Sequence, residues 1–390
     1  MLLQFKTTPV CSSAWLPGTN APAKYRTTLQ LPEPCKCVTF TDFKPHSARL
    51  DPTDKSRTNR PKMVHPMQRP LQRPWNGIQK NDCWMSALPE VLWAVPLYNL
   101  CIPGSHDAMS FCLDENSPID PRQSKTLKML DKKLPCIIRP IIYKWSTTQE
   151  LSVSEQLDSG IRYLDLRIAH KPDDASKNLY FIHMLFTTMT VEDALKEMSN
   201  WLEFHPKEAL ILACRQLHGM TVKHHKHLIS CLKRTFGLKL CPKTENPTLQ
   251  NMWQKGYQVV VSYEDCIAEK YAELWPPVPY WWGNTTRTQA LICYLEKKKQ
   301  QGRPGGFFVA GINLTENLWY ILKHPFGSLK KLTVPKLPCL GDWVQNQCPG
   351  SQQDGINIIA GDFIEIDHFV NDVIELNHKY LHSYRQPTVV

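Results

Sequence analysis

Residues 160–168 read GIRYLDLRI, and this segment has the pattern of a β-strand with two chemically different faces. Side chains alternate along a strand, so Tyr163, Asp165 and Arg167 lie on one face and three aliphatic residues lie on the other. Inside a barrel of parallel strands, a polar face of this kind points into the mouth. The segment therefore predicts a barrel strand that carries charged side chains to the open end of the barrel.

From about Asn81 onward, short apolar runs alternate with longer segments of helical periodicity, which is typical of parallel βα units. Amphipathic helices are expected over 191–204, 222–236 and 367–380. The expected strands are 97–102, 161–168, 179–182, 209–214, 258–262, 307–312 and 357–360. The predicted fold class is α/β, a TIM-like (β/α) barrel. The prediction includes an irregular or incomplete barrel, because the eighth strand has only two weak candidates, 127–144 and 329–343.

Polar residues stand at or just beyond the ends of the expected strands. They are His106, Asp165, Arg167, His183, Arg215, Tyr263, Asn313 and Asp362. In a (β/α)₈ barrel the carboxyl ends of different strands meet at one mouth, although they are remote in sequence. We therefore expect these side chains to form a single site.

Taken one at a time, these residues have ordinary structural explanations. A histidine at a strand end, such as His183, is often a satisfied structural residue, and Asp165 with Arg167 is a possible structural ion pair. The set is harder to explain in this way, because Asp107 directly follows His106 in a Pro-Gly turn. Two histidines, a carboxylate beside one of them and an arginine are the parts needed to cleave a phosphodiester by acid–base catalysis.

Three segments resemble the X-domain signature of phosphatidylinositol-specific phospholipase C. They are PGSHD at 103–107, RYLDLR at 162–167 and the strand that ends at His183. The resemblance covers residues 82–390, and it implies a barrel that cleaves phosphatidylinositol to diacylglycerol and an inositol cyclic phosphate.

The resemblance also implies roles for individual residues. His106 corresponds to the general base that takes the proton from the inositol 2-hydroxyl, and Asp362 to the residue that orients this base. His183 corresponds to the general acid, paired with Asp107, and Arg167 would neutralise the charge that develops on the phosphoryl oxygens.

Three more positions are expected to bind substrate. Arg215 matches a position where bacterial relatives carry an inositol-binding lysine, and Asp165 lies on the inward face of its strand. Tyr263 aligns near an arginine of the bacterial inositol pocket, so head-group recognition is expected to differ there.

No catalytic metal and no cofactor are expected. The calcium-dependent relatives carry an asparagine after the first histidine and an acidic residue at the position of Arg167, whereas this chain has Asp107 and Arg167. A guanidinium beside the scissile phosphate would repel a calcium ion. The histidines 224, 225 and 227 are interpreted as a solvated helix face, and Cys35-x-Cys37 lacks a second ligand pair for zinc.

Residues 1–81 differ from the rest of the chain in composition. They contain 13 Lys and Arg against 4 Asp and Glu and 11 of the 31 prolines, whereas residues 82–390 contain 33 basic and 32 acidic residues. We therefore predict a basic, Pro-rich, mostly disordered N-terminal extension over 1–81 and a catalytic barrel over 82–390.

Cellular context follows from composition and from the resemblance. The 14 cysteines are scattered and are read as reduced, and the longest apolar runs are far below the ~18–20 residues of a membrane span. We expect a cytoplasmic monomer that contacts phosphatidylinositol in membranes peripherally and does not bind nucleic acid. The alternative is a catalytically weak inositol-lipid-binding or interaction module, because the pocket has diverged around Tyr263. A glycerophosphodiester phosphodiesterase is disfavoured, because its His-Arg-Gly and metal-carboxylate pattern is missing.

Overall fold

The computed structural model describes residues 80–171, 178–217 and 219–384. The predicted extension over 1–81 lies outside these residues except for its last two positions. None of the helices within the described ranges is long and apolar enough to cross a membrane.

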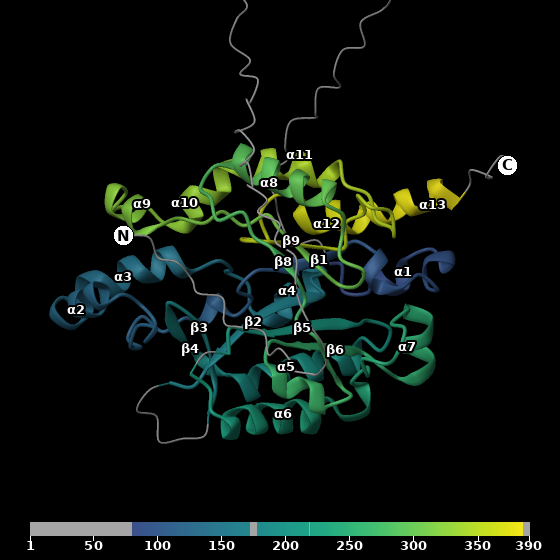
Figure 1. Cartoon of the computed structure of the whole chain (residues 1–390), viewed down its shortest axis with the longest axis horizontal. Helices are drawn as coiled ribbons and strands as arrows, with labels where there is room; N and C mark the ends of the chain where they lie inside the picture. The colour runs from purple at the N-terminus through teal and green to yellow at the C-terminus, as the bar shows by residue number, and fades with distance from the viewer. Residues whose placement is uncertain (1–79, 172–177, 218, 385–390) are drawn as a thin grey trace, which may run out of the picture. The chain divides into compact units, whose positions relative to one another are not determined.

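A curled sheet of parallel strands forms the centre of the described chain (Figure 1). Neighbouring strands pair in the order β7 (Leu274–Trp275), β6 (Val259–Tyr263), β5 (Leu210–Arg215), β2 (Tyr163–Ala169), β1 (Ile102–Ser105), β10 (Ile358–Gly361), β9 (Val309–Gly311) and β8 (Tyr280–Trp281). Most of their hydrophobic residues are buried on both faces, as expected for parallel strands covered by helices.

The barrel is incomplete between β7 and β8, which are the two ends of this strand order. These strands are consecutive in the chain and are joined by Pro276, Pro277, Val278 and Pro279. Proline has no backbone N–H to donate to a neighbouring strand, so this segment is poorly suited to close the ladder. The predicted α/β fold with an incomplete TIM-like barrel is confirmed.

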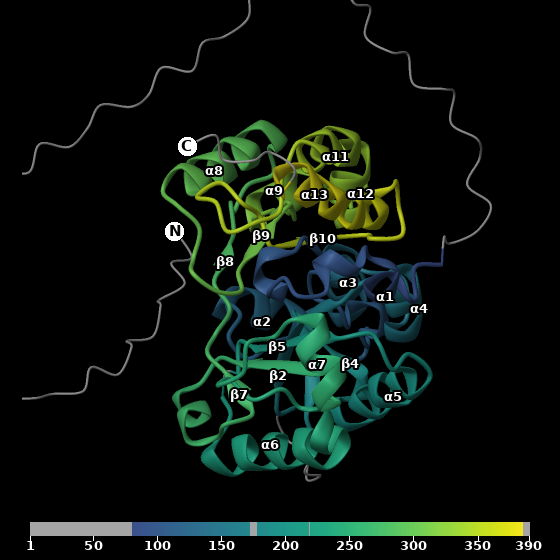
Figure 2. The same cartoon turned by 90° about the vertical axis from the view of Figure 1, so that its right-hand side faces the viewer.

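Helices cover the outside of the sheet. Figure 2 shows α5 (Val191–Phe204) and α6 (Val222–Phe236) below the strands, and α8 (Thr288–Gln300), α11 (Leu337–Gln345) and α12 (Phe369–Glu375) above them. The first two helices have the predicted bounds, and α12 with its following 3₁₀ turn covers most of 367–380. Six further helices, each of seven residues or fewer, are α1 (Trp84–Ala87), α4 (Val153–Ser159), α7 (Leu249–Lys255), α9 (Leu318–Lys323), α10 (Leu329–Thr333) and α13 (Lys379–Tyr384).

Both candidates for the eighth strand are wrong, because they are helices. Residues 127–144 fall in α2 (Lys125–Lys133) and α3 (Pro135–Ser146), and residues 329–343 fall in α10 and α11. The Ser124 side chain accepts a hydrogen bond from the Leu127 amide at the start of α2, and Pro135 opens α3. Both are helix-start signals. The additional barrel strands, β7 and β8, have two residues each and give almost no periodic signal.

The strand predicted at 97–102 begins only at Ile102, because Leu97–Asn99 form a short 3₁₀ turn. The reason lies far away in the chain. The Asn357 side chain donates hydrogen bonds to the carbonyls of Leu97 and Leu100, so these groups need no partner strand.

The strand predicted at 179–182 also differs in its pairing. It is β3 (Tyr180–His183), which lies antiparallel to β2 and forms a hairpin with β4 (Leu185–Thr190). The turn between the two strands is made at Met184, which has a positive φ of 65°. His183 therefore enters the site from a hairpin beside the barrel and not from a βα unit.

Arg162, which directly precedes β2, is fully buried and joins several separate segments. Its guanidinium lies 2.8 Å from Glu208 in an ion pair and donates hydrogen bonds to the carbonyls of Leu157, Ile161 and Asp82. The pair thus ties the start of the described chain to α4 and to the segment before β5. A buried charge of this kind is tolerated only while its partners remain in place.

Glu208→Leu is therefore expected to lower the free energy of unfolding by ~3–5 kcal/mol, because it leaves the Arg162 charge buried without a counter-ion. Urea denaturation followed by circular dichroism measures this loss. The control is Glu273→Leu, which breaks the partly exposed pair with Lys233 and should cost at most ~1 kcal/mol. Equal losses in the two variants would contradict the role assigned to the buried pair.

Candidate active site

The ends of four barrel strands bring most of the predicted residues together. His106 directly follows β1, Asp165 and Arg167 lie in β2, Arg215 ends β5, and Asp362 directly follows β10. The backbone registers place Arg167 opposite Arg215 on neighbouring strands, and Ser105, before His106, opposite Gly361, before Asp362. Residues paired in a parallel register point to the same face of the sheet. Arg167 and Arg215 therefore share one face, and so do His106 and Asp362, which each follow a residue of the second pair.

His106 forms the first pair of the site. Its Nδ1 lies 2.7 Å from Oδ1 of Asp362, and its Nε2 lies 2.7 Å from Nη2 of Arg167. A guanidinium can only donate, so Nε2 must be the unprotonated nitrogen and Nδ1–H must donate to Asp362. His106 thus carries its lone pair on the nitrogen that faces Arg167, and this lone pair accepts the hydrogen bond from the guanidinium.

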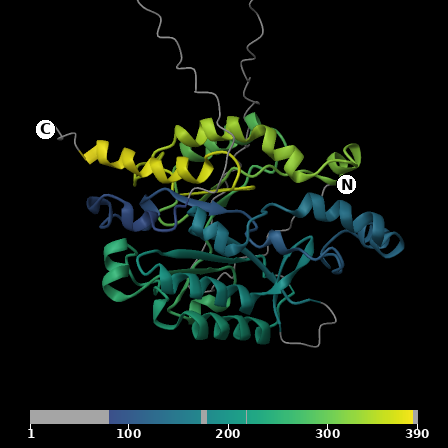
Figure 3. The same cartoon turned by 180° about the vertical axis from the view of Figure 1, so that it is seen from behind.

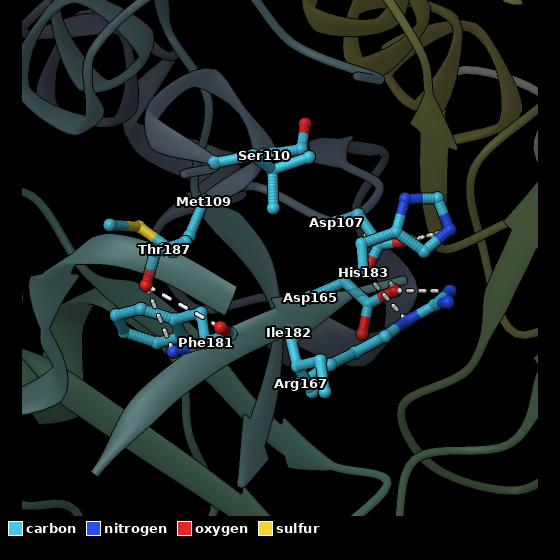
Figure 4. A pocket seen from close by; sticks show the side chains of 10 residues that line it. Asp107, Met109, Ser110, Asp165, Arg167, Phe181, Ile182, His183 and Thr187 are labelled. Carbon is cyan, nitrogen blue, oxygen red and sulfur yellow. Dashed lines mark hydrogen bonds and ion pairs between the residues drawn. The ribbon is translucent and has the colours of Figure 1, made fainter. Parts of the chain in front are cut away.

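Asp107 lies between the two histidines and the arginine. Its Oδ1 is 2.7 Å from Nε of Arg167, and its Oδ2 is 3.2 Å from Nε2 of His183 and 3.4 Å from Nε2 of His106. Figure 4 shows Asp107, Asp165, Arg167 and His183 directed toward one another beside a pocket that is otherwise largely apolar. A single buried carboxylate therefore contacts both histidines of the site and Arg167.

The orientation of His183 is fixed from the opposite side. Its Nδ1 lies 2.6 Å from the carbonyl oxygen of Ser146, at the end of α3, and must donate to it because a carbonyl only accepts. This contact turns Nε2 toward Asp107. The two imidazole rings stand edge to face, with their centroids 6.2 Å apart.

The surroundings shift the pKa values of His106 and His183 in opposite directions. Burial lowers the pKa of His106, but the carboxylates of Asp362 and Asp107 outweigh this effect and the pKa is raised overall. Burial lowers the pKa of His183, and Asp107 offsets this only in part because Arg167 and His106 act in the same direction as burial. Titratable pairs that are pushed apart in this way identify a stronger base and a stronger acid.

Asp165 and Arg215 are the remaining charged side chains of the site. Asp165 is buried, and although burial opposes ionisation, Arg167 and Arg215 hold the pKa of its carboxyl below the usual value. Arg215 lies over the ring of Tyr280, 4.9 Å from its centroid. The Tyr280 hydroxyl donates to the Asn313 side chain at 2.9 Å, and the ring fits there because Gly311 has no side chain.

Tyr263 is not brought to this cluster. Its hydroxyl lies 2.9 Å from Nδ1 of His225 in the outer helix α6. Its register partner is Cys214, one position before Arg215, so its side chain points to the opposite face of the sheet. The interpretation of 224, 225 and 227 as one solvated face is wrong at His225, which is buried against Tyr263.

A cation could in principle use ligand atoms of His106, Asp107 and Asp165, which lie within 4.8 Å of one another. Arg167 already occupies these carboxylates, with Nε 2.7 Å from Asp107 and Nη2 3.2 Å from Asp165. A metal ion would have to displace a fixed positive charge from the same oxygens. The residues therefore do not fit a calcium site.

The backbone turns sharply after each strand-end residue of the site. Asp107, Met184, Gln216 and Phe363 directly follow His106, His183, Arg215 and Asp362, and all four have positive φ angles between 44° and 65°. Such angles are unfavourable for residues other than glycine, and they cluster at functional sites because the surrounding structure enforces them. Within the described residues, only two other non-glycine positions have a positive φ.

Gln149 is the main residue that sequence reasoning missed. Its side chain is fully buried, and Nε2 donates to the carbonyls of His106 at 3.0 Å and Gly361 at 2.9 Å. Thr148 beside it donates to the His106 carbonyl at 3.0 Å. Gln149 thus fixes the turn that carries His106 to the turn that carries Asp362. The only signal in the sequence is a polar run, STTQ at 146–149, after an apolar helix.

We expect Gln149→Leu to lower the pKa of His106, because the turn that carries Asp362 is no longer held and the ion-pair contact lengthens. Titration of the histidines by nuclear magnetic resonance measures this shift. Two carbonyls also lose a donor, so the free energy of unfolding should fall by ~1–3 kcal/mol.

The matched control is Gln258→Leu. The Gln258 side chain is buried and donates to the carbonyls of His205 and Glu208, outside the site. It should cost similar stability and leave the pKa of His106 unchanged. The same pKa shift in both variants would show that Gln149 acts only on stability.

Three comparisons place the chain among known proteins. The family model described as PI-PLC X 1 matches residues 143–285. The human PI-PLC X domain-containing protein 1 is 58% identical over 302 residues, which cover 77% of this chain and 94% of the relative. The mouse PI-PLC X domain-containing protein 2 is 41% identical over 76% of this chain and 88% of its own length.

Among solved structures, the phosphatidylinositol-specific phospholipase C from Listeria monocytogenes is similar with a TM-score of 0.53. It is 18% identical in sequence, and the match covers 76% of this chain and 99% of the bacterial chain. At this identity the likeness supports the fold of the barrel.

Proposed function

Because the chain belongs to the PI-PLC X-domain family, we propose that it is a metal-independent phosphodiesterase that cleaves phosphatidylinositol. The products would be diacylglycerol and an inositol cyclic phosphate. The observation that carries this proposal is the arrangement around Asp107, where two histidines with opposite pKa shifts and an arginine meet one carboxylate.

In the proposed reaction His106 is the general base. Its Nε2 accepts the proton of the inositol 2-hydroxyl while that oxygen attacks phosphorus, and Asp362 stabilises the resulting imidazolium through Nδ1–H. In the structure Arg167 donates to the same Nε2. The guanidinium would move its Nη2 to a phosphoryl oxygen when substrate binds, which frees the lone pair and neutralises the charge of the phosphorane.

His183 is the proposed general acid. Protonated Nε2 would give its proton to the diacylglycerol oxygen as the bond from this oxygen to phosphorus breaks. The Ser146 carbonyl and Asp107 hold the ring in one orientation. The lowered pKa of His183 makes its protonated form a stronger acid.

The inositol ring would lie over Asp165 and Arg215. Oδ1 of Asp165 is buried and has no hydrogen-bond partner within the described residues. A buried acceptor without a partner is expected to receive one from a ligand. Tyr263, which points away, could influence binding only through His225 and α6.

The same proposal places the protein in the cytoplasm as a monomer in peripheral contact with membranes. The alternative is an inositol-lipid-binding module with little turnover. One observation favours it, because Arg167 occupies the nitrogen that would act as the base. The next two experiments separate the two functions.

His106→Ala and His183→Ala should each reduce cleavage of a soluble short-chain phosphatidylinositol by ~10²–10⁴-fold, since each removes one proton-transfer group. The initial rate of diacylglycerol release measures the loss, and circular dichroism shows whether each variant is folded. The control is His205→Ala, a half-buried histidine that stacks on Trp201 outside the site. If either site variant kept the wild-type rate, that histidine would have no role in proton transfer.

Wild-type cleavage should continue in the presence of a calcium chelator, because Arg167 supplies the positive charge beside the phosphate. Arg167→Ala should lose ~10²–10³-fold in rate. The matched control is Arg139→Ala, which removes an arginine of α3 that is paired with Asp131 of α2. This variant should retain activity. Wild-type activity that stops with chelator and returns with calcium would overturn the metal-free mechanism.

A further inference from the structure

An aspartate, a cysteine and a histidine meet outside the candidate active site. Asp82 and Cys83 stand just before α1, and His205 directly follows α5. One ligand atom from each of the three lies within 4.8 Å of the other two. Within the described ranges only one other group of His, Cys, Asp or Glu side chains is this close, and that group belongs to the candidate active site. The three residues are therefore a second place at which a metal ion could be held.

This group lies at the amino ends of the barrel strands. Arg162, which directly precedes β2, donates to the backbone carbonyl of Asp82 at 2.7 Å. The side chains of the candidate active site lie at the carboxyl ends of the strands. Figures 1 and 3 both show α1 at the opposite end of the described chain from α2. An ion bound beside α1 would therefore not touch the candidate active site.

Two contacts fix the imidazole ring of His205. Its Nδ1 lies 2.7 Å from the carbonyl oxygen of Trp201 and must donate to it. The ring stacks on Trp201 with centroids 3.8 Å apart, and Trp201 is itself held by a hydrogen bond to Asp158. Nε2 of His205 then lies 3.6 Å from Oδ2 of Asp82. Metal-binding histidines are oriented in this way, by a hydrogen bond from the ring nitrogen that does not bind the metal.

The contact between His205 and Asp82 lacks a hydrogen atom to share. Because Nδ1 holds the ring proton, neutral His205 turns the lone pair of Nε2 toward a carboxylate oxygen, which can only accept. Two acceptors face each other favourably only when a cation lies between them, and that cation is either an additional proton or a metal ion. The sulfur of Cys83 completes a set of nitrogen, oxygen and sulfur donors, which is the set that zinc prefers.

The charges of the three side chains suit a divalent ion. The carboxylate of Asp82 and a thiolate at Cys83 carry two negative charges, and neutral His205 carries none, so bound zinc would leave the group uncharged. The buried charge of Arg162 nearby is neutralised by Glu208. Burial and the Asp82 carboxylate raise the pKa of the Cys83 thiol, so its proton would leave only when a metal ion binds.

Lys80 competes with a metal ion for the same carboxylate. Its Nζ lies 2.7 Å from Oδ2 of Asp82, but its side chain is 65% exposed. An exposed lysine contributes little to such a pair, because water solvates the ammonium group equally well. Arg167 differs in this respect, since its guanidinium is held against two buried carboxylates. Zinc can therefore replace Lys80 at Asp82, whereas calcium would have to displace a fixed charge at Arg167.

We propose that Asp82, Cys83 and His205 bind a zinc ion, with water as the fourth ligand. Tetrahedral zinc with bonds of ~2.0–2.3 Å places its ligand atoms ~3.3–3.6 Å apart. The separation of 3.6 Å between His205 and Asp82 already fits this geometry. On binding, the Cys83 thiol releases its proton to solvent and its sulfur bonds to zinc. The ion would join the segment before α1 to the end of α5. This inference does not depend on the proposed function.

The experiment uses full-length protein that is freed of metal with a chelator and then titrated with cobalt(II) or zinc. Cobalt(II) reports its ligands, because a bound thiolate adds a near-ultraviolet absorption band and four-coordinate geometry adds visible bands. Wild type should show both signatures, and zinc should abolish them because it binds such sites more tightly. Zinc at about a hundredfold excess over its Kd should also raise the melting temperature by ~5 °C.

Cys83→Ser should lose the near-ultraviolet band and bind zinc at least ~100-fold more weakly, because it removes a ligand itself and not an outer partner. His205→Ala should lose zinc to a similar extent. The same His205→Ala protein should keep the wild-type rate of cleavage of the soluble short-chain substrate, since the ion lies at the other end of the strands.

The matched controls are variants of a thiol and a histidine that lack the complete donor set. Cys293 is an exposed cysteine of α8, and Cys293→Ser should bind as wild type does. His378 has Nε2 3.7 Å from a carboxylate oxygen of Glu375, but no third ligand residue joins this pair within the described residues. His378→Gln should therefore also keep the cobalt spectrum. Cys35→Ser with Cys37→Ser tests the other closely spaced cysteines of the chain.

The zinc site is refuted if wild type gives no cobalt spectrum, if Cys83→Ser keeps the near-ultraviolet band, or if the variant of Cys35 and Cys37 loses it. The first result would leave His205 and Asp82 as an ion pair only. Wild type that binds zinc through Cys83 but cleaves no phosphatidylinositol would refute the proposed function and leave the zinc site standing. Cleavage without zinc binding would refute the zinc site alone.

Discussion

The buried carboxylate of Asp107 is the interaction on which the rest of the site depends. It contacts Arg167, His183 and His106 within 3.4 Å while being almost entirely removed from water. Burying a carboxylate is costly unless ionic and hydrogen-bond partners compensate for lost hydration. Arg167 therefore has a structural task, which is to provide an ionic partner for the buried Asp107 carboxylate at 2.7 Å, as well as its proposed task at the phosphate. Because the groups share one carboxylate, the effects of removing two of them will not add.

This carboxylate stands where it does only because the backbone is held in an unfavourable conformation. Asp107 has a φ of 44°, and the side chains of Thr148 and Gln149 bond to the carbonyls of the same turn. Gln149 also reaches the turn that carries Asp362. The parallel pairing of β1 with β10 brings these two turns together, although they are some 250 residues apart in sequence. The incomplete barrel thus provides a rigid scaffold, and a few buried polar side chains hold the site residues in fixed positions on it.

The sequence was informative where a local pattern decides the structure. The alternation at 160–168 correctly put Asp165 and Arg167 on one face, and α5 and α6 begin and end where their apolar periodicity does. It was uninformative where distant residues decide. The Asn357 side chain replaces a partner strand at Leu97 and Leu100, and a hairpin, not a βα unit, delivers His183. The prediction that the Tyr263 side chain faces the site was wrong, because Ser262, the partner of Ala213, points inward instead. The segment VVVSY is apolar on both faces, so its sequence does not reveal which residues face the site.

The charge of the site suggests how its acid becomes protonated. The site contains three buried carboxylates, at Asp107, Asp165 and Asp362, and two partly exposed guanidinium groups, at Arg167 and Arg215. With both histidines neutral, these groups sum to one negative charge. In the proposed mechanism a phosphodiester adds a second negative charge close to His183 and engages Arg167, whose positive charge otherwise lowers the pKa of His183. Both changes favour the protonated imidazole, because nearby negative charge raises the pKa of a histidine. In the proposed mechanism, substrate binding therefore raises the pKa of His183, so that His183 takes up the proton that it later donates.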